Sequence, residues 1–392
     1  MPNHAAPPES ESCAWKKTSR VCWHIITGEY PPITGGVSDY THQVAQSLVS
    51  LGQEVHVWVP ACIQKRQQTD GSVVIHETDG TFRFKDLRLI SKLFKGQQGS
   101  RRLLVQYVPH AFGFKGLNVG FCVWLLTQRR SNPWIMFHEV AYPIGVRQSL
   151  KHNLLGMVNR LMAFLAMRAA SRALVSTSSW KPMLGGRCEC LPIPSNIPRI
   201  PNQRLTDTVR KKYKVSEHIV GHFGTYGDNI KPLLKKVIQS IYAAIPSVSF
   251  LLLGRGAEEF AKETREYLPS AGSIFGVGNL SAPELSAHLS ACDVMIQPFL
   301  DGVTTRRTSV MAGLAHGLPI VTTSGPLTES FWAHKRAVEM CPLGRPDIFA
   351  TVVNKLLTDQ SARSSLSESA LQTYDDCFSI EAHLRKLLKP SV

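Results

Sequence analysis

The chain has 392 residues, of which 43% are hydrophobic and 19% are charged, and its formal net charge is +15. This composition is typical of a globular protein with two domains, and no run of about 18 apolar residues offers a membrane-spanning helix. Residues 1–200 hold 23 Lys and Arg against 11 Asp and Glu, whereas residues 201–392 hold 21 against 18. The excess in the first half favours an anionic partner, either a phosphorylated substrate, an acidic membrane face or nucleic acid, unless it serves only solubility.

Residues 1–18 contain prolines and charged side chains but no apolar stretch, so we expect a disordered tail rather than a secretory signal. The nine cysteines are scattered, and the closest pair, Cys188 and Cys190, has no second pair or histidine at zinc-ligand spacing. We therefore expect buried thiols in a reducing compartment, a cytoplasmic location and no metal site.

The first half of the chain predicts a parallel sheet. A buried strand at 21–27, a helix at 40–51 and a strand at 54–59 form a βαβ unit, which places its first loop at the edge of the sheet where such folds bind ligands. Three more strands are expected at residues 103–107, 134–137 and 173–176. A long helix is expected at residues 150–170. We assign residues 19–195 to this first domain, on the acceptor side.

Four prolines between Pro192 and Pro201 interrupt helix and central strand alike, so we expect an inter-domain linker at 196–214. A second domain, 215–375, repeats the alternation. Its strands are expected at residues 219–224, 248–254, 273–276, 293–298 and 318–323, with helices such as 231–245 and 283–292 between them. The last segment, 376–392, predicts a helix at 380–388 that packs back on the first domain.

Two loops carry groups that suit a phosphate. After the first strand, Gly35 and Gly36 can take positive φ values and let backbone N–H groups approach an anion at a helix N-terminus, although a plain turn capped by Ser38 has the same pattern. After the strand at 293–298, a polar loop bears Arg306 and Arg307 and leads into a helix near Thr308. Arginine donates paired hydrogen bonds to phosphate oxygens, but a solvated basic turn is the alternative.

The order of six segments resembles the retaining GT-B glycosyltransferases of family four over residues 20–385. The segments are G-G-V-S-D-Y, L-G-Q-E-V-H-V, F-H-E-V-A-Y, V-S-T-S-S-W, L-S-A-C-D-V-M-I-Q-P and A-H-G-L-P-I-V. The resemblance implies an α/β protein with the GT-B fold, in which two Rossmann-like doubly wound domains face one another across a cleft.

The resemblance also implies roles for particular residues. Gly35 and Gly36 would face the donor diphosphate, and His138 would lie beside the transferred sugar, where an imidazole can bind a hydroxyl or stabilise charge, unless it only caps its loop. Lys231 would bind the diphosphate, and the arginine that usually accompanies it is missing, with Arg255 as a weaker candidate. The nucleotide base would rest near the turn that includes Val277 and Gly278.

The chain departs from the family at its E-x7-E signature, whose two glutamates usually contact the sugar and the ribose. In one register these positions are Asp301, as a catalytic contact to the sugar, and Ser309; in the other they are Thr304 and Ala312. Neither register restores the second acid. We expect the polar loop to hold the diphosphate more strongly instead, through Thr304, Thr305, Arg306, Arg307 and Thr308.

These features predict a hexosyltransferase-type enzyme that moves a sugar from a nucleotide diphosphate-sugar to a hydroxyl acceptor, with retention, without metal or cofactor, in polysaccharide or glycolipid synthesis. The basic excess predicts either a phosphorylated or lipid-linked acceptor or peripheral docking on an anionic membrane, with Lys92, Lys95, Arg101 and Arg102 as contributors. Nucleic acid is not expected, because aromatic residues do not alternate with the basic ones. The alternatives are a GT-B protein that has lost catalysis and a GT-B epimerase or phosphorylase.

Overall fold

The computed structural model describes residues 20–62, 67–79, 82–96, 98–146, 148–213, 217–268 and 273–389, so the tail expected at 1–18 lies outside the described residues. The chain divides into two compact units. The first comprises the residues up to Leu174 together with Met183–Glu189, and the second comprises Val175–Pro182 and the residues from Cys190 onward.

The first unit contains an eight-stranded sheet in the order β3-β4-β2-β1-β5-β6-β7-β8. The pairs joining β4, β2, β1, β5 and β6 are parallel, while the short β3 runs antiparallel to β4. Its elements are β1 (Cys22–Ile26), α1 (Gly36–Ser50), β2 (Glu54–Pro60), β3 (Thr69–Asp70), β4 (Val73–Thr78), α2 (Phe84–Gly96), β5 (Arg101–Tyr107), α3 (Val119–Thr127), β6 (Trp134–Phe137), α4 (Leu150–Ala169), β7 (Arg172–Val175) and β8 (Glu189–Cys190).

The second unit contains a six-stranded, wholly parallel sheet in the order β11-β10-β9-β12-β13-β14. Its elements are α5 (Gln203–Tyr213), β9 (His218–Phe223), α6 (Lys231–Ala244), β10 (Val248–Leu253), α7 (Ala257–Tyr267), β11 (Ile274–Val277), α8 (Ala282–Ser290), β12 (Val294–Gln297), α9 (Thr308–Ala315), β13 (Ile320–Ser324), α10 (Ser330–Lys335), β14 (Glu339–Pro342), α11 (Pro346–Thr358), α12 (Gln360–Cys377) and α13 (Ile380–Leu388).

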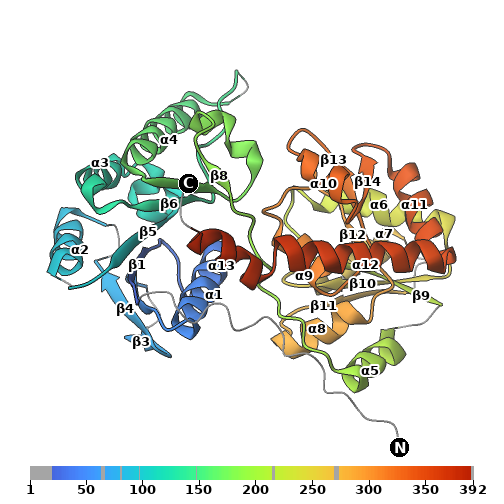
Figure 1. Ribbon diagram of the computed structural model, residues 1–392. Coiled ribbons are helices and arrows are strands. Elements are labelled where there is room, and N and C mark those ends of the chain that lie inside the picture. Colours follow the sequence, from blue (N-terminus) through green and yellow to red (C-terminus); the bar gives the residue numbers. More distant parts are fainter. Residues whose placement is uncertain are drawn as a thin grey trace, which may run out of the picture. The chain divides into compact units, whose positions relative to one another are not determined.

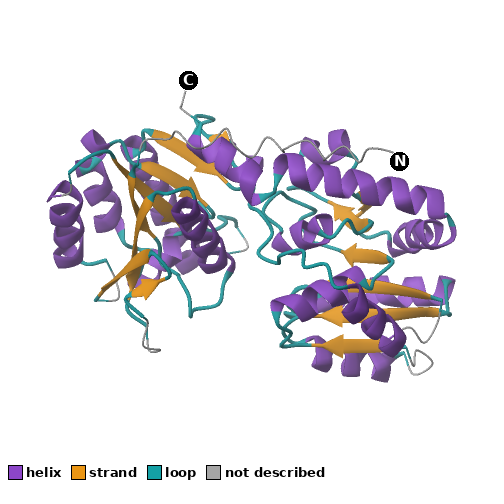
Figure 2. Ribbon diagram, turned by 60° about the horizontal axis from the view of Figure 1, so that its bottom comes forward, coloured by secondary structure: helices purple, strands orange, loops and turns teal. Residues whose placement is uncertain are grey.

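Each sheet is a central layer with helices on both faces (Figures 1 and 2). The central strands are buried throughout, β1 and β10 over their whole length, as expected for parallel strands covered on both sides. The predicted α/β class with two Rossmann-like domains is confirmed. Every strand predicted from the sequence is present within two residues of its expected ends, since long buried runs are the clearest local signal.

The structure differs from the sequence prediction in the segment expected to be a linker. Residues 203–213 form α5, which buries Thr206, Val209 and Tyr213 on one face and belongs to the second unit. The prolines precede this helix and do not interrupt it, so only the stretch before it is irregular. The C-terminal helix α13 also belongs to the second unit, where it follows α12, and its packing on the first domain stays a prediction. In the described part of the chain, no helix is long and apolar enough to cross a membrane.

Candidate functional site

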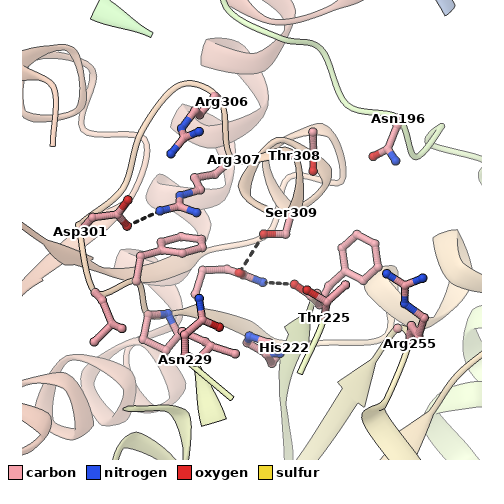
Figure 3. Close-up of a pocket in the computed structure, with 18 residues that line it drawn as sticks. Asn196, His222, Thr225, Asn229, Arg255, Asp301, Arg306, Arg307, Thr308 and Ser309 are labelled. Carbon is pink, nitrogen blue, oxygen red and sulfur yellow. Dashed lines mark hydrogen bonds and ion pairs between the residues drawn. The ribbon is translucent and has the colours of Figure 1, made fainter. Parts of the chain in front are cut away.

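The second unit has a cavity of about 760 Å³ at the carboxyl ends of three neighbouring strands, β10, β9 and β12 (Figure 3). The chain proceeds from β9 to β10 on one side and returns to β12 on the other, and such a switch in direction leaves a crevice between the loops. The cavity is lined by Asn196, His222, Phe223, Gly224, Thr225, Asn229, Ile230, Gly254, Arg255, Gln297, Pro298, Phe299, Leu300, Asp301, Arg306, Arg307, Thr308 and Ser309.

Two helices begin at the wall of this cavity. Asn229 and Ile230 precede α6, and Thr308 and Ser309 form the first turn of α9. Neither helix has a side chain that caps its N-terminus. The first N–H groups of a helix have no intrahelical partner and carry partial positive charge, so the start of α9 offers the N–H groups of Thr308 and Ser309 to an anion in the cavity. At α6 the Lys231 N–H donates to the Gly227 carbonyl at 3.2 Å and Pro232 has no N–H, so this helix contributes the partial positive charge of its N-terminus.

Three arginines reach the same cavity: Arg255 after β10, and Arg306 and Arg307 from the loop before α9. Arg307 forms an ion pair with Asp301, and its guanidinium lies 4.4 Å from the centre of the Phe299 ring. Its Nε has no hydrogen-bond partner among the described residues. Burial lowers the pKa of Arg307 while Asp301 raises it, and the guanidinium remains charged at neutral pH. Arg307 therefore places a fixed cation at the cavity wall, while its unpartnered Nε is buried.

The two registers of the E-x7-E comparison differ in whether their residues line the cavity or are buried inside the unit. Asp301 and Ser309 both line the cavity, whereas Thr304 and Ala312 are completely buried. Ser309 Oγ donates to Gln297 Oε1 at 3.0 Å, and Gln297 Nε2 donates to the Phe223 carbonyl at 2.8 Å. Gln297 thus connects the start of α9 to the end of β9, and only the first register puts both positions on the wall.

Glu329, which the sequence analysis did not single out, anchors the polar loop on its buried side through hydrogen bonds to Thr305. Its buried carboxylate accepts hydrogen bonds from the Thr305 backbone N–H at 2.6 Å and the Thr305 hydroxyl at 2.8 Å. It also accepts from the Thr177 hydroxyl at 2.7 Å and the Ser178 backbone N–H at 2.8 Å. Thr305 therefore points into the protein rather than into the cavity, and it fixes the backbone that carries Arg306 and Arg307.

Glycine is required at position 302, where the loop turns toward the arginines. Gly302 has a φ of 87°, and a Cβ atom there would overlap Thr328 Oγ1 and the backbone N of Gly325. We expect Gly302→Ala to destabilise the protein by about 2–4 kcal/mol in urea unfolding, since both the backbone conformation and the space exclude a side chain. Gly344 is the matched control, because its φ is 83° but no atom lies within 4 Å of its Cβ position. A similar loss for Gly344→Ala would contradict the steric part of this account.

His222, near the end of β9, lines the cavity and was not identified in the sequence analysis. Its ring lies 3.0 Å from the Tyr226 hydroxyl (Nδ1 to Oη), and burial lowers its pKa to about 3. The folded protein therefore holds it neutral at any working pH. Only its position near the carboxyl end of a predicted strand could have indicated the site, and histidines occur often in buried strands.

This buried histidine predicts how stability depends on pH. Below pH ~6.5 the unfolded chain is protonated at His222, whereas the folded chain keeps this histidine neutral. The free energy of unfolding should therefore decrease as the pH is lowered, by up to ~1.4 kcal/mol per pH unit. Urea unfolding at pH 7, 6 and 5 should show a shallower decline for His222→Asn than for the unaltered protein. The exposed His334→Asn serves as control, and equal slopes for all three proteins would refute the prediction.

Five residues of the second unit that were expected at the diphosphate or the base do not line this cavity: Thr304, Thr305, Lys231, Val277 and Gly278. Lys231 Nζ pairs with Glu263 at 2.8 Å, which directs the side chain along α6 and α7. Val277 and Gly278 lie beside the wall residue Gly254, whose N–H donates to the Val277 carbonyl at 3.0 Å. The structure brings together Asp301, Arg306, Arg307 and Thr308 as predicted, and adds Arg255 in place of Lys231.

The glycine pair of the first unit is arranged differently from expectation. Gly35 is extended, with a φ of 175°, and Gly36 is the first residue of α1, so neither uses positive φ. A Cβ on Gly35 would lie 2.7 Å from a Glu29 carboxylate oxygen. Burial, together with Glu139 and Asp39, raises the pKa of Glu29. The start of α1 favours an anion but these carboxylates oppose it, so the diphosphate contact stays a prediction.

His138 directly follows β6, as predicted, and it is buried. Its Nε2 lies 2.8 Å from Gln106 Oε1, and its ring meets Tyr40 edge-on at 4.9 Å. These contacts fix the ring, which suits both a positioned catalytic group and a structural histidine. Among the described residues, the one group of three potential metal ligands within 4.8 Å of one another is Cys22, Glu54 and His56, on β1 and β2 of the first unit.

Comparisons with known proteins agree with this architecture. A family model described as "Glycosyl transferases group 1" matches residues 217–359, and no curated protein matches the chain. A glycosyltransferase from Rickettsia africae has a TM-score of 0.69 and 13% identity, over 95% of this chain and 97% of that one. A sucrose-phosphate synthase from Thermosynechococcus elongatus gives 0.65 and 14%, over 94% and 97%.

A third similar structure is Anabaena HepE in complex with UDP and glucose, with a TM-score of 0.65 and 15% identity, over 94% of this chain and 98% of that one. At these identities the likeness establishes the fold, which is GT-B. The family match over the second unit and the GT-B fold together support a place in the GT-B glycosyltransferase superfamily.

Proposed function

We propose that the chain is a glycosyltransferase that moves a sugar from a nucleotide diphosphate-sugar to a hydroxyl of an acceptor. The observation that carries this proposal is the cavity of the second unit, where Arg255, Arg306 and Arg307 meet two uncapped helix N-termini. This arrangement is complementary to a diphosphate, and its volume of about 760 Å³ is in the range of cofactor-sized ligands.

The reaction follows from where charge develops. As the bond between the sugar and the diphosphate breaks, negative charge grows on the phosphate oxygen, and arginines and helix amides placed in advance stabilise it. The acceptor oxygen bonds to the sugar carbon on the same face, and its proton leaves on the departing phosphate oxygen. We propose that this occurs with retention and without a divalent cation, because these groups supply the positive charge. Asp301 would bind a hydroxyl of the transferred sugar.

The choice of donor follows from a similar structure, and the choice of acceptor from the charge of the first half of the chain. Since a similar structure holds UDP and glucose, a UDP-hexose is the first donor to examine. The basic excess of residues 1–200 supports a phosphorylated or lipid-linked hydroxyl acceptor, and hence a role in polysaccharide or glycolipid synthesis. His138 and the Gly35-Gly36 pair remain proposed contacts to the sugar and the diphosphate.

A thermal-shift series with UDP, GDP, ADP and their hexose derivatives tests the proposal directly. One nucleotide should raise the melting temperature, because a ligand that binds only the folded state stabilises it by an amount that grows with the logarithm of its concentration above the dissociation constant. The matching sugar nucleotide should then release nucleotide in the presence of acceptor extract, at the same rate with and without EDTA. No shift with any nucleotide would overturn the proposal, and loss of turnover in EDTA would overturn its metal-independent form.

A catalytically inactive sugar-nucleotide-binding protein is the second candidate, because serine stands at the wall position of the second carboxylate. The two differ in turnover rather than in binding. A thermal shift without hydrolysis or transfer for every donor would favour the binding protein.

A further inference from the structure

The outer face of α4 in the first unit is unusually apolar. Its large apolar side chains Leu150, Leu154, Met157, Leu161 and Phe164 recur every three or four residues along one line, and their exposed fractions lie between 48% and 87%. The inner face is built mainly from small residues, including Gly156, Ala163, Ala166 and Ala169. Asn159 on that face donates to the Gly116 carbonyl at 2.7 Å. The helix therefore packs through its small residues and leaves its large ones uncovered.

Exposed apolar side chains also occur on α3, which packs beside α4, and on α2, which packs beside α3 (Figure 1). Phe114, Leu117 and Val123 are exposed at α3 and its preceding loop, and Phe84, Leu89 and Leu93 are exposed on α2. A shallow hollow of about 800 Å³ lies between α2 and α3, lined by Phe82, Phe84, Phe114, Leu117, Val123 and Trp124 among others. Exposed large apolar side chains thus lie on three helices of the first unit, and a concentration of such side chains marks an interaction site.

The same face is almost without negative charge. Residues 82–170 contain fourteen Lys and Arg but only two acids, Asp86 and Glu139. Asp86 is buried and accepts from the Arg83 backbone N–H at 2.9 Å at the start of α2, and Glu139 lies outside the three helices. Exposed basic side chains stand among the apolar ones at the start of α2 and along it: Arg83, Arg88, Lys92 and Lys95. Lys85, also exposed, forms an ion pair with Asp79, which precedes α2.

We propose that α2, α3 and α4 form a docking surface for a bilayer that contains anionic lipids. Apolar side chains would enter the boundary between headgroups and acyl chains, and the interspersed Lys and Arg would meet the lipid phosphates, which is the composition of interfacial helices. A second copy of the chain is a poor occupant, because pairing would bring these basic faces together. The surface lies wholly in the first unit and does not depend on the transfer reaction.

The structure also changes which basic residues take part. Lys92 lies exposed on α2 and Lys95 follows it. In contrast, Arg101 and Arg102 on β5 lie over aromatic rings, 5.2 Å from the centre of Phe94 and 4.2 Å from the centre of Trp134. Burial lowers the pKa of Arg102. The docking surface therefore uses the basic residues of α2 rather than the pair on β5.

Vesicle flotation of the full chain tests the proposal. The protein should float with phosphatidylglycerol–phosphatidylcholine vesicles at low salt, float less as salt rises, and stay in solution with phosphatidylcholine alone. Arg88→Glu combined with Lys92→Glu should raise the lipid concentration for half-binding at least about tenfold, since each basic residue near an anionic surface contributes several-fold. Lys211→Glu combined with Lys335→Glu makes the same charge change on exposed lysines of the second unit and should leave binding unchanged.

Serine substitutions test the contribution of the exposed apolar side chains to membrane binding. Leu154→Ser, Met157→Ser and Phe164→Ser together should abolish flotation, whereas Tyr267→Ser and Leu343→Ser, also exposed, should not. Equal binding by surface variants and controls, or no flotation with anionic vesicles, would overturn the proposal. So would a chain that dimerises through this face in sedimentation and does not bind vesicles. Nucleotide thermal shifts should be equal in all these variants, which separates this test from the proposed transfer reaction.

Discussion

Arg307→Ala should weaken binding of the nucleoside diphosphate by about 10- to 100-fold, because a hydrogen bond between a guanidinium and phosphate is worth about 1.5–3 kcal/mol. The variant also leaves Asp301 on the cavity wall without its ion-pair partner. The uncompensated carboxylate would then repel the phosphates. The nucleotide affinity of Arg307→Lys should lie between those of Arg307→Ala and the unaltered protein, since lysine keeps the charge but lacks the planar pair of donors.

Isothermal titration with the nucleotide selected by thermal shift measures this effect. Arg345→Ala is the matched control, because Arg345 also pairs with an aspartate, Asp347, but on an exposed part of the second unit. The two variants remove the same side chain and the same type of ion pair. Equal affinities for Arg307→Ala and Arg345→Ala would show that the cavity is not the nucleotide site.

Glu329→Ala should destabilise the protein by about 3–5 kcal/mol, the largest stability effect we expect from a single substitution. The change removes one carboxylate that accepts from Thr305, Thr177 and Ser178, and it leaves their buried donors without a partner. Because these bonds hold the loop that carries Arg306 and Arg307, nucleotide binding should weaken as well.

Urea unfolding and titration of the same sample separate the two effects of Glu329. Glu329→Gln keeps the shape and half of the acceptors, so it should lose less stability than alanine. Glu368→Ala, on the exposed face of α12, should change neither stability nor affinity. A Glu329→Ala protein that unfolds like the unaltered one would refute the anchoring role, and one that is destabilised but binds nucleotide normally would separate the anchor from the site.

Ten of the fourteen strands in the described residues were predicted because their signals are local, whereas β3, β4, β8 and β14 were not. Residues 134–137 and 380–388 coincide with β6 and α13, since an apolar run or an amphipathic period needs no information from distant residues. Residues 203–213 were assigned to a linker because of the prolines before them. Their helix is stabilised by burying Val209 and Tyr213 within the second unit, a tertiary effect that composition does not reveal.

The candidate site was predicted in part. The loop before α9 was identified from its arginines, and Asp301, Arg306, Arg307 and Thr308 do meet at one cavity. The role of Lys231 was transferred from family position alone, and Glu263 on a different helix holds that side chain elsewhere. Thr304 and Thr305 were counted as anion ligands because their hydroxyls suit phosphate, yet both point inward. Side-chain direction depends on neighbours that lie far away in sequence.

The sequence by itself determined that two mainly parallel sheets form, where ten of their strands run, and that a basic polar loop follows the strand at 293–298. Periodicity, glycine and proline positions, and the charge of residue types are enough for these conclusions. Only the tertiary structure decided that Arg255 joins the site, that Glu329 anchors the loop, and that the apolar residues of α4 face outward. Each of these depends on which distant segments pack together, and packing is settled by the whole fold.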